Sequence, residues 1–270
     1  MYLDHVQAVG IHGLIFSELQ RLHYQQMLAA RLFPAAPHRR DFQYHVQLDA
    51  STPTVEFSTP PEETAEPRVV AAKAHQFASI AYDPPTLLWS FANFFADYRD
   101  KTPIPRAILD FGLANDLAGF TTESWAYSDQ DLSVADAAPL ATELLRFLGG
   151  CSVEILGPGY LPIYVSTSAT SRQLILVEGF HPHLPALEFA DVHRHLAEVL
   201  RYMVAARHSI HLPLQGLARH MSWQFHHEPL TDGNQWSIGT AERWLTVSVR
   251  NQNGHLVVDI QVHPATGYLG

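Results

Sequence analysis

The sequence has a single cysteine and no long apolar run, and each scarcity excludes a class of protein. Cys151 alone cannot form an internal disulfide, which excludes a disulfide-rich secreted scaffold. No apolar stretch approaches the length of about 20 residues that spans a bilayer, and the N-terminus lacks the basic flank and apolar run of a secretory signal. We therefore expect a cytoplasmic protein without membrane-spanning segments.

Basic residues are also scarce. The 270 residues hold 17 Lys and Arg against 27 Asp and Glu, which gives a formal net charge of −10. The longest basic cluster is Arg39-Arg40, which is too little to hold a phosphate backbone or an anionic membrane surface. We expect neither nucleic acid nor membrane among the partners. Histidine, in contrast, is abundant at 17 residues, so acidification should change the charge of this protein more than usual.

Motifs of common enzyme chemistry are missing as well. The chain has no Gly-x-Ser-x-Gly elbow, no Gly-x-x-x-x-Gly-Lys loop and no Gly-x-Gly-x-x-Gly, so serine-hydrolase and nucleotide chemistry have no sequence basis. Cys151 follows Gly149-Gly150 at the start of a predicted strand, without a helix N-terminus to lower its pKa, and we interpret it as a buried, inert thiol. We predict no organic cofactor.

What the chain does contain is an alternation of helical and strand patterns. Apolar residues three and four apart predict a helix from Ile11 to Phe33, which Pro34 ends. Period-two patterns then predict four strands, at 42–48, 54–57, 69–82 and 87–93. The acidic, proline-rich segment 59–67 between them is predicted to be an exposed loop.

The remaining chain repeats this order. Further helices are predicted at 105–119, 138–148, 189–207 and 214–220, the second of them stopped by Gly149-Gly150. Further strands are predicted at 151–156, 161–165 and 173–177, and in a terminal hairpin, 245–250 and 256–262, turned by Asn253-Gly254. The order predicts an α+β protein in which helices cover antiparallel sheets. We expect modules at 1–180 and 181–270, or one compact unit, and a degenerate duplication stays open.

The strand from Leu87 to Asn93 is the most informative segment. On an extended strand Trp89, Phe91 and Asn93 project to one face, while Ser90 and Ala92 project to the other. A Trp/Phe face either fills a core, which is the usual role of aromatic side chains, or lines a concavity with Asn93 at its rim.

Residues from about 19 to 177 resemble an uncharacterised bacterial family, a domain of unknown function. The features that carry the resemblance are a Gln-rich helix ending near Gln25-Gln26, the 42–57 strand pair, the Leu87–Asn93 strand, the 108–112 helix and the Gly157–Tyr160 segment. That strand is similar to the family's aromatic-Ala-aromatic-Ala-Asn signature, although Ser90-Phe91 stands where the family tends to have Ala-Trp. The resemblance implies an α+β domain and no activity.

A second candidate site lies on the helix predicted from residue 189. Asp191, His195 and Glu198 share one helical face, and carboxylates with a histidine on adjacent turns could hold a divalent metal. The other interpretation is a solvated face with pairs such as Arg194–Glu198. A metal would need a further ligand, and the nearest histidines are His181, His183, His208 and His211. On a strand His226 and His227 would point to opposite faces, so they cannot jointly chelate one ion without a bulge.

Two functions of different classes follow from these sites. The leading hypothesis is a non-catalytic binding or protein-interaction protein that presents the face of Trp89, Phe91 and Asn93 to an unidentified protein or small-molecule ligand. The alternative is a metal-dependent hydrolase built on the carboxylate/histidine helix face. The exposed hairpin ending near His263 also predicts pairing across a two-fold axis into a homodimer.

Overall fold

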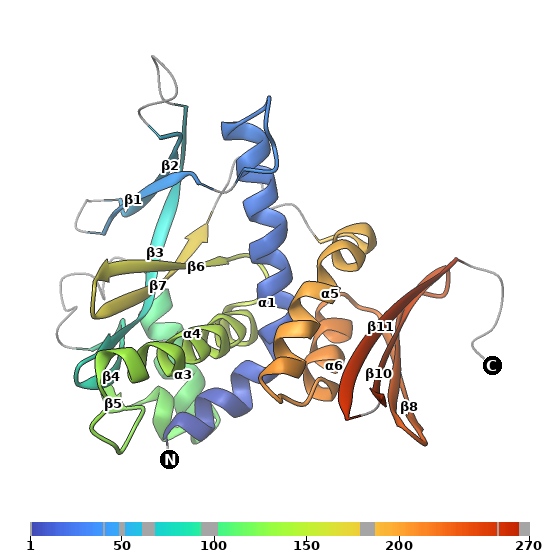
Figure 1. The fold of residues 1–270 in the computed structure, drawn as a ribbon. Helices are drawn as coiled ribbons and strands as arrows, with labels where there is room; N and C mark the ends of the chain where they lie inside the picture. Colours follow the sequence, from blue (N-terminus) through green and yellow to red (C-terminus); the bar gives the residue numbers. More distant parts are fainter. Residues whose placement is uncertain are drawn as a thin grey trace.

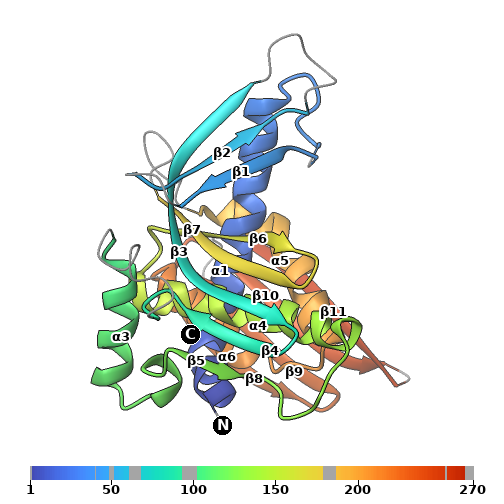
Figure 2. The ribbon, with the colours of Figure 1, turned by 90° about the vertical axis from the view of Figure 1, so that its left-hand side faces the viewer.

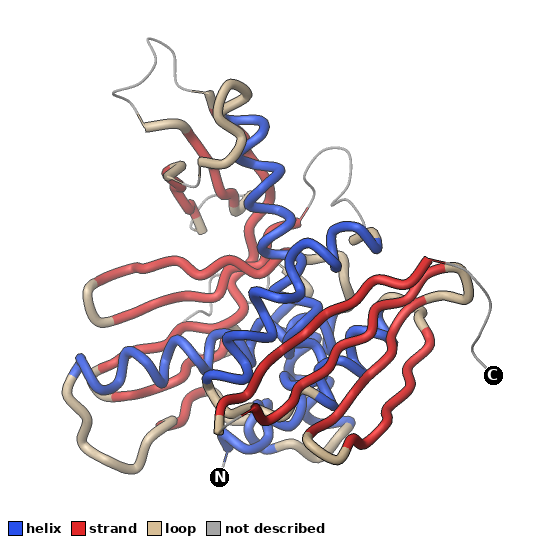
Figure 3. Tube along the Cα trace, turned by 45° about the vertical axis from the view of Figure 1, so that its right-hand side comes forward, coloured by secondary structure: helices blue, strands red, loops and turns tan. Residues whose placement is uncertain are grey.

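Two antiparallel sheets lie on either side of a layer of helices (Figures 1 and 3). The computed structural model describes residues 2–39, 41–48, 52–60, 68–92, 102–178, 187–252 and 254–264. The arrangement confirms the predicted α+β class with antiparallel sheets. No helix in these ranges is long and apolar enough to cross a membrane.

The helical layer is built around the first helix. The α-helices are α1 (Tyr2–Leu32), α3 (Ile104–Ala114), α4 (Val134–Leu156), α5 (Phe189–Ala205) and α6 (His211–His220), with a 3-10 turn, η2 (Ala118–Phe120). α1 contacts α4, α5 and α6, so it joins the part of the chain before residue 180 to the part after it. Ser133 caps α4 by accepting a hydrogen bond from the Asp136 amide at 3.3 Å.

Two sequence predictions about helix boundaries were wrong. α1 begins at Tyr2 rather than at Ile11, and α4 continues through Gly149-Gly150 to Leu156, where a strand was predicted. A Cβ on Gly150 would lie 1.9 Å from the Gly10 carbonyl oxygen, and one on Gly13 would lie 2.3 Å from the Gly150 carbonyl oxygen. These glycines do not stop helices; they let the backbones of α1 and α4 touch.

The first sheet, sheet A, is organised by its longest strand. Its strands are β1 (Gln43–Gln47), β2 (Thr54–Ser58), β3 (Val69–Tyr82), β4 (Pro85–Trp89), β5 (Ser124–Ala126), β6 (Leu161–Ser168) and β7 (Ser171–Glu178). β3 pairs with β2 near its start and with β4 near its end, while β7 pairs along its other edge and carries β6. The predicted strand 87–93 therefore ends at Trp89, and Ser90 and Phe91 form a turn.

The second sheet, sheet B, is a four-stranded meander with the order β11-β10-β9-β8. Its strands are β8 (Gln224–Leu230), β9 (Gly233–Gly239), β10 (Arg243–Gln252) and β11 (His255–Pro264). The predicted terminal hairpin is confirmed, with Val247 opposite Ile260. Leu245 and Val247 of β10 are fully buried on the face that meets the helices.

A single large core connects the helices with both sheets. It includes Leu14 of α1, Leu148 of α4, Leu196 of α5 and Val247 of β10. A smaller second core lies between the C-terminal half of α1 and strands β1, β2 and β6, and Figure 2 shows β1 and β2 beside that half of α1.

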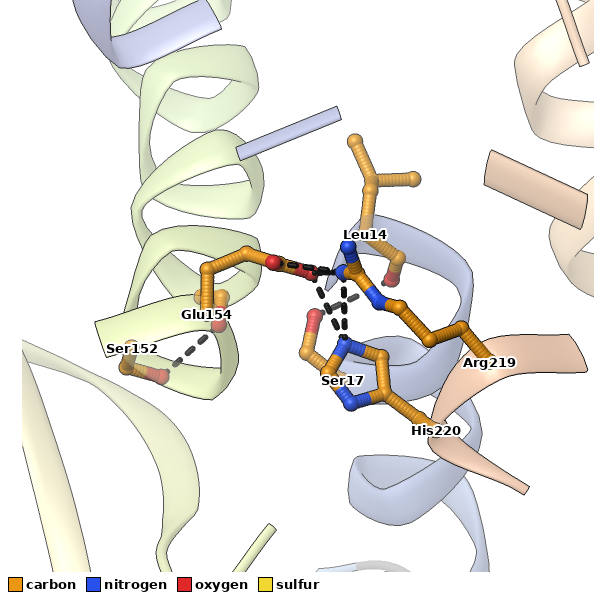
Figure 4. Close-up of polar contacts among 7 residues, drawn as sticks. Leu14, Ser17, Ser152, Glu154, Arg219 and His220 are labelled. Atoms are coloured by element: carbon orange, nitrogen blue, oxygen red, sulfur yellow. Dashed lines mark hydrogen bonds and ion pairs between the residues drawn. The ribbon is translucent and has the colours of Figure 1, made fainter. Parts of the chain in front are cut away.

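A partly exposed polar contact also links α4 to α6 (Figure 4). The Glu154 carboxylate accepts from Arg219 Nη2 at 2.5 Å and pairs with His220 Nε2 at 2.8 Å. Burial alone would raise the pKa of Glu154, but His220 and Arg219 outweigh it and hold that pKa below its usual value. Glu154 therefore stays charged at neutral pH and ties the two helices together.

Candidate functional site

The aromatic strand face proposed from the sequence is filled core. Trp89 is 0% exposed and Phe91 is 6% exposed. The Trp89 ring stacks on Phe120 at 5.2 Å between centroids, and its Nε1 donates to the Gly119 carbonyl at 2.8 Å. Asn93 lies outside the described residues. Trp89 and Phe91 therefore present no open face to a ligand.

The carboxylate/histidine face of α5 packs against α1. Asp191 accepts from the Glu188 amide at 3.1 Å, and its other carboxylate oxygen lies 3.1 Å from Nδ1 of His23. His195 Nε2 lies 3.3 Å from Gln26 Oε1, and Glu198 is exposed. Burial and Arg194 lower the pKa of His195. In the described ranges no three His, Cys, Asp or Glu side chains are placed to share a metal ion.

The remaining histidines of that hypothesis take separate positions. His181 and His183 lie outside the described residues. His208 lies 3.3 Å from Glu143 of α4, and His211 opens α6, where its Nδ1 accepts from Trp236 Nε1 at 3.1 Å. Neither approaches the Asp191 face closely enough to form a common site. Cys151 is fully buried inside α4, and burial raises the pKa of its thiol, as expected of an inert cysteine.

A pocket of about 220 Å³ opens instead between α1 and the β1, β2 and β6 strands. We call it the α1–β6 pocket. Its apolar lining is Leu28, Phe42, Phe57, Leu161 and Ile163, and its polar lining is Arg21, Tyr24, Gln25, Tyr44 and Tyr164. The Phe57 ring meets Tyr24 and Phe42 edge to face, at 6.3 and 5.9 Å between centroids. These contacts fix the orientation of the aromatic walls.

A buried carboxylate organises the polar end of the α1–β6 pocket. Glu18, which is 4% exposed, accepts from Arg21 Nη2 at 2.7 Å and from the Tyr164 hydroxyl at 3.0 Å. Arg21 Nε also donates to Glu18, at 3.2 Å. Nε and Nη2 of Arg21 thus both donate to Glu18, whereas Nη1 forms no hydrogen bond within the described part of the chain. Glu18 therefore fixes one edge of the guanidinium, and the Nη1 atom still has N–H groups to donate.

The protonation states in this network follow from burial and charge. Burial and the Glu18 carboxylate together raise the pKa of Tyr164 well above its usual value. Burial alone would lower the pKa of Arg21, but Glu18 outweighs it and raises that pKa. At neutral pH the phenol keeps its proton and the guanidinium keeps its charge, which Glu18 balances. The pocket thus combines apolar walls with a donor group whose charge lies next to the Glu18 carboxylate.

Sequence reasoning missed this pocket for a physical reason. Glu18 and Tyr164 are 146 positions apart, and neither belongs to a recognisable motif. The one local signal was Glu18 within the apolar pattern of the first helix, because a carboxylate on a buried face requires partners. The sequence could not show that β6 supplies one of them.

The fold and pocket define an α+β protein with a small, mostly apolar site beside an ion pair between half-buried Arg21 and buried Glu18. The chain belongs to a family of unknown function, DUF6882, whose model matches residues 19–176. All ten residues that line the α1–β6 pocket fall inside that match. No curated protein matches the chain, and no solved structure does.

Proposed function

We propose that this is a non-catalytic binding protein whose α1–β6 pocket holds a small molecule with an apolar ring and one uncharged hydrogen-bond acceptor. The observation that carries the proposal is an apolar pocket beside a guanidinium that Glu18 both fixes and neutralises. Ligand sites are typically apolar concavities with a few placed polar groups. A volume of about 220 Å³ favours a ligand with a single ring.

The charge balance favours an uncharged acceptor. An anion would approach Arg21 but would also face the Glu18 carboxylate, which lies 2.7 Å from the same guanidinium. A ketone or amide oxygen can accept from Arg21 Nη1 without that repulsion. The proposal keeps the binding function inferred from the sequence and moves it from the Trp89 face to the second, smaller core.

The ligand class can be tested with two molecules of the same shape. Acetophenone carries a ring and a ketone oxygen, and ethylbenzene lacks only the acceptor. We expect calorimetry to give about fivefold tighter binding of acetophenone, since one hydrogen bond contributes about 1 kcal/mol. Equal binding of the two molecules would remove Arg21 from the proposal, and binding of neither would remove the ligand class.

A variant places the binding in the α1–β6 pocket. Ile163→Phe adds volume to a half-buried pocket wall, and we expect it to abolish acetophenone binding. Leu88→Phe adds a ring at a half-buried strand position outside the pocket, so it should bind as the unchanged protein does. Undiminished binding by a folded Ile163→Phe variant would place the ligand elsewhere.

We also propose that the protein acts in the cytoplasm. Its one cysteine, Cys151, is buried and unpaired, as is common where the environment keeps thiols reduced. Fractionation of cells that express the untagged chain tests this location.

A further inference from the structure

A second concavity of about 610 Å³ lies between the α5–α6 connection and the helix-facing side of sheet B. We call it the α6 groove. Residues 207–211 form one wall, and His227, Asn234 and Trp236 form the wall on β8 and β9. None of these residues belongs to the α1–β6 pocket, and all lie after the segment that the family model matches.

The rings in the α6 groove are fixed by one another. Trp236 Nε1 donates to His211 Nδ1 at 3.1 Å. An indole N–H can only donate, so this His211 nitrogen accepts and the proton of the neutral ring sits on Nε2. The His227 ring stacks on Trp236 at 5.3 Å between centroids, and its Nε2 lies 2.9 Å from Asn234 Oδ1. The groove therefore presents imidazoles in set orientations.

The charge of the α6 groove differs from that of the whole protein. The chain carries a formal net charge of −10, yet no Asp or Glu among the described residues lines the groove. The charge of a protonated His208 would be balanced by Glu143, 3.3 Å away. Arg207 is exposed and forms no ion pair within the described part of the chain. It is therefore the cation available to a ligand in the groove.

Apolar surface completes the α6 groove. Val249 of β10 is half-buried, and Leu256 of β11 is 56% exposed. A ligand that covers Leu256 would remove this apolar side chain from water. One bound molecule could thus use both a cation and an apolar surface.

We propose that the α6 groove binds an organic anion, a carboxylate or a phosphate monoester that carries an apolar group. Arg207 meets the anionic end, the Nε2–H of His211 offers a second donor, and Leu256 and Val249 cover the apolar end. This site is independent of the proposed α1–β6 ligand, which is uncharged.

Phenyl phosphate and benzoate are the two probes, with benzyl alcohol as the uncharged comparison. Calorimetry should detect at least one anion, and the indole N–H signal of Trp236 should shift in NMR spectra of the same titration. Binding of phenyl phosphate alone would support a phosphate ligand, and binding of both anions would support anions in general. Benzyl alcohol binding as tightly as the anions, or an unshifted Trp236 signal, would overturn the proposal.

Arg207→Gly gives a sharp test because it should not harm folding. Arg207 has a φ of +59°, a backbone conformation that glycine adopts more readily. Ser222→Gly is the matched control, with a φ of +55° just after the other end of α6. We expect Arg207→Gly to bind the anion at least tenfold more weakly and Ser222→Gly to bind it unchanged. Equal affinities of the two variants would overturn the role of Arg207.

Discussion

Replacing Gly150 by alanine should separate the two central helices. The new Cβ would lie 1.9 Å from the Gly10 carbonyl oxygen and 2.9 Å from the Leu14 amide nitrogen, whereas ordinary contacts begin at 3.4 Å. The neighbouring atoms are backbone, so no side chain can rotate away. α1 and α4 must therefore move apart by roughly 1.5 Å along this contact.

The expected loss is the difference between two effects. Alanine gains about 1 kcal/mol over glycine in a helix interior. Overpacking costs about 1–3 kcal/mol, and the upper end applies where two rigid backbones meet. The free energy of unfolding should fall by about 2 kcal/mol, which in a chain of this size lowers Tm by roughly 4–8 °C.

Thermal unfolding followed by circular dichroism measures this change. Gly159→Ala is the matched control, since a Cβ there has no heavy atom within 4 Å, and its Tm should stay close to that of the unchanged protein. The buried thiol of Cys151, beside Gly150, should react faster with a thiol reagent in Gly150→Ala. A Gly150→Ala variant that is as stable as the parent, with an unreactive thiol, would refute the close helix contact.

Three further predictions concern charge, metal and assembly. The fold lowers the pKa of Glu154, so the stabilising effect of its charge is present at neutral pH and is lost as the pH falls through that pKa. Glu154→Gln should therefore lower Tm at pH 7, and the Tm values of the variant and the parent should converge in acid. A Tm difference that does not change with pH would contradict this. Protein purified without a His-tag should contain no stoichiometric zinc or manganese, since Asp191 is already bonded to the Glu188 amide and paired with His23; stoichiometric metal would revive the hydrolase hypothesis. β11 is an edge strand with Val257 38% exposed, so light scattering should give a dimer that Val257→Lys disrupts, and a monomer at high concentration would contradict pairing.

Local patterns predicted the terminal hairpin but not the course of α4. The β10–β11 hairpin was predicted because strand alternation and Asn253-Gly254 are local signals. The course of α4 was not predicted, because Gly149-Gly150 is a helix stop in isolation and a helix contact only in the presence of α1. What distinguishes the two is a second backbone that lies more than 100 residues away in the sequence.

For the candidate sites, too, the sequence predicted what depends on local patterns and missed what depends on contacts between distant segments. The strand pattern placed Trp89 and Phe91 on one face, which could either fill a core or line a concavity. The burial of both side chains shows that they fill the core. It placed Asp191 and His195 on one helical face, yet could not show that His23 and Gln26 of α1 occupy that face. Both pockets are lined by residues from several elements, so neither has a local sequence signal.

NMR with isotope-labelled methyl groups can locate bound acetophenone, and so tests directly whether the α1–β6 pocket is the binding site. Binding there should give intermolecular NOEs from the acetophenone ring to the methyls of Leu28 and Leu161, which line the α1–β6 pocket. Methyls of sheet B, such as those of Val249, should show none. NOEs confined to other methyls, or a titration that leaves Leu28 and Leu161 unchanged, would contradict the claim that this pocket is the binding site.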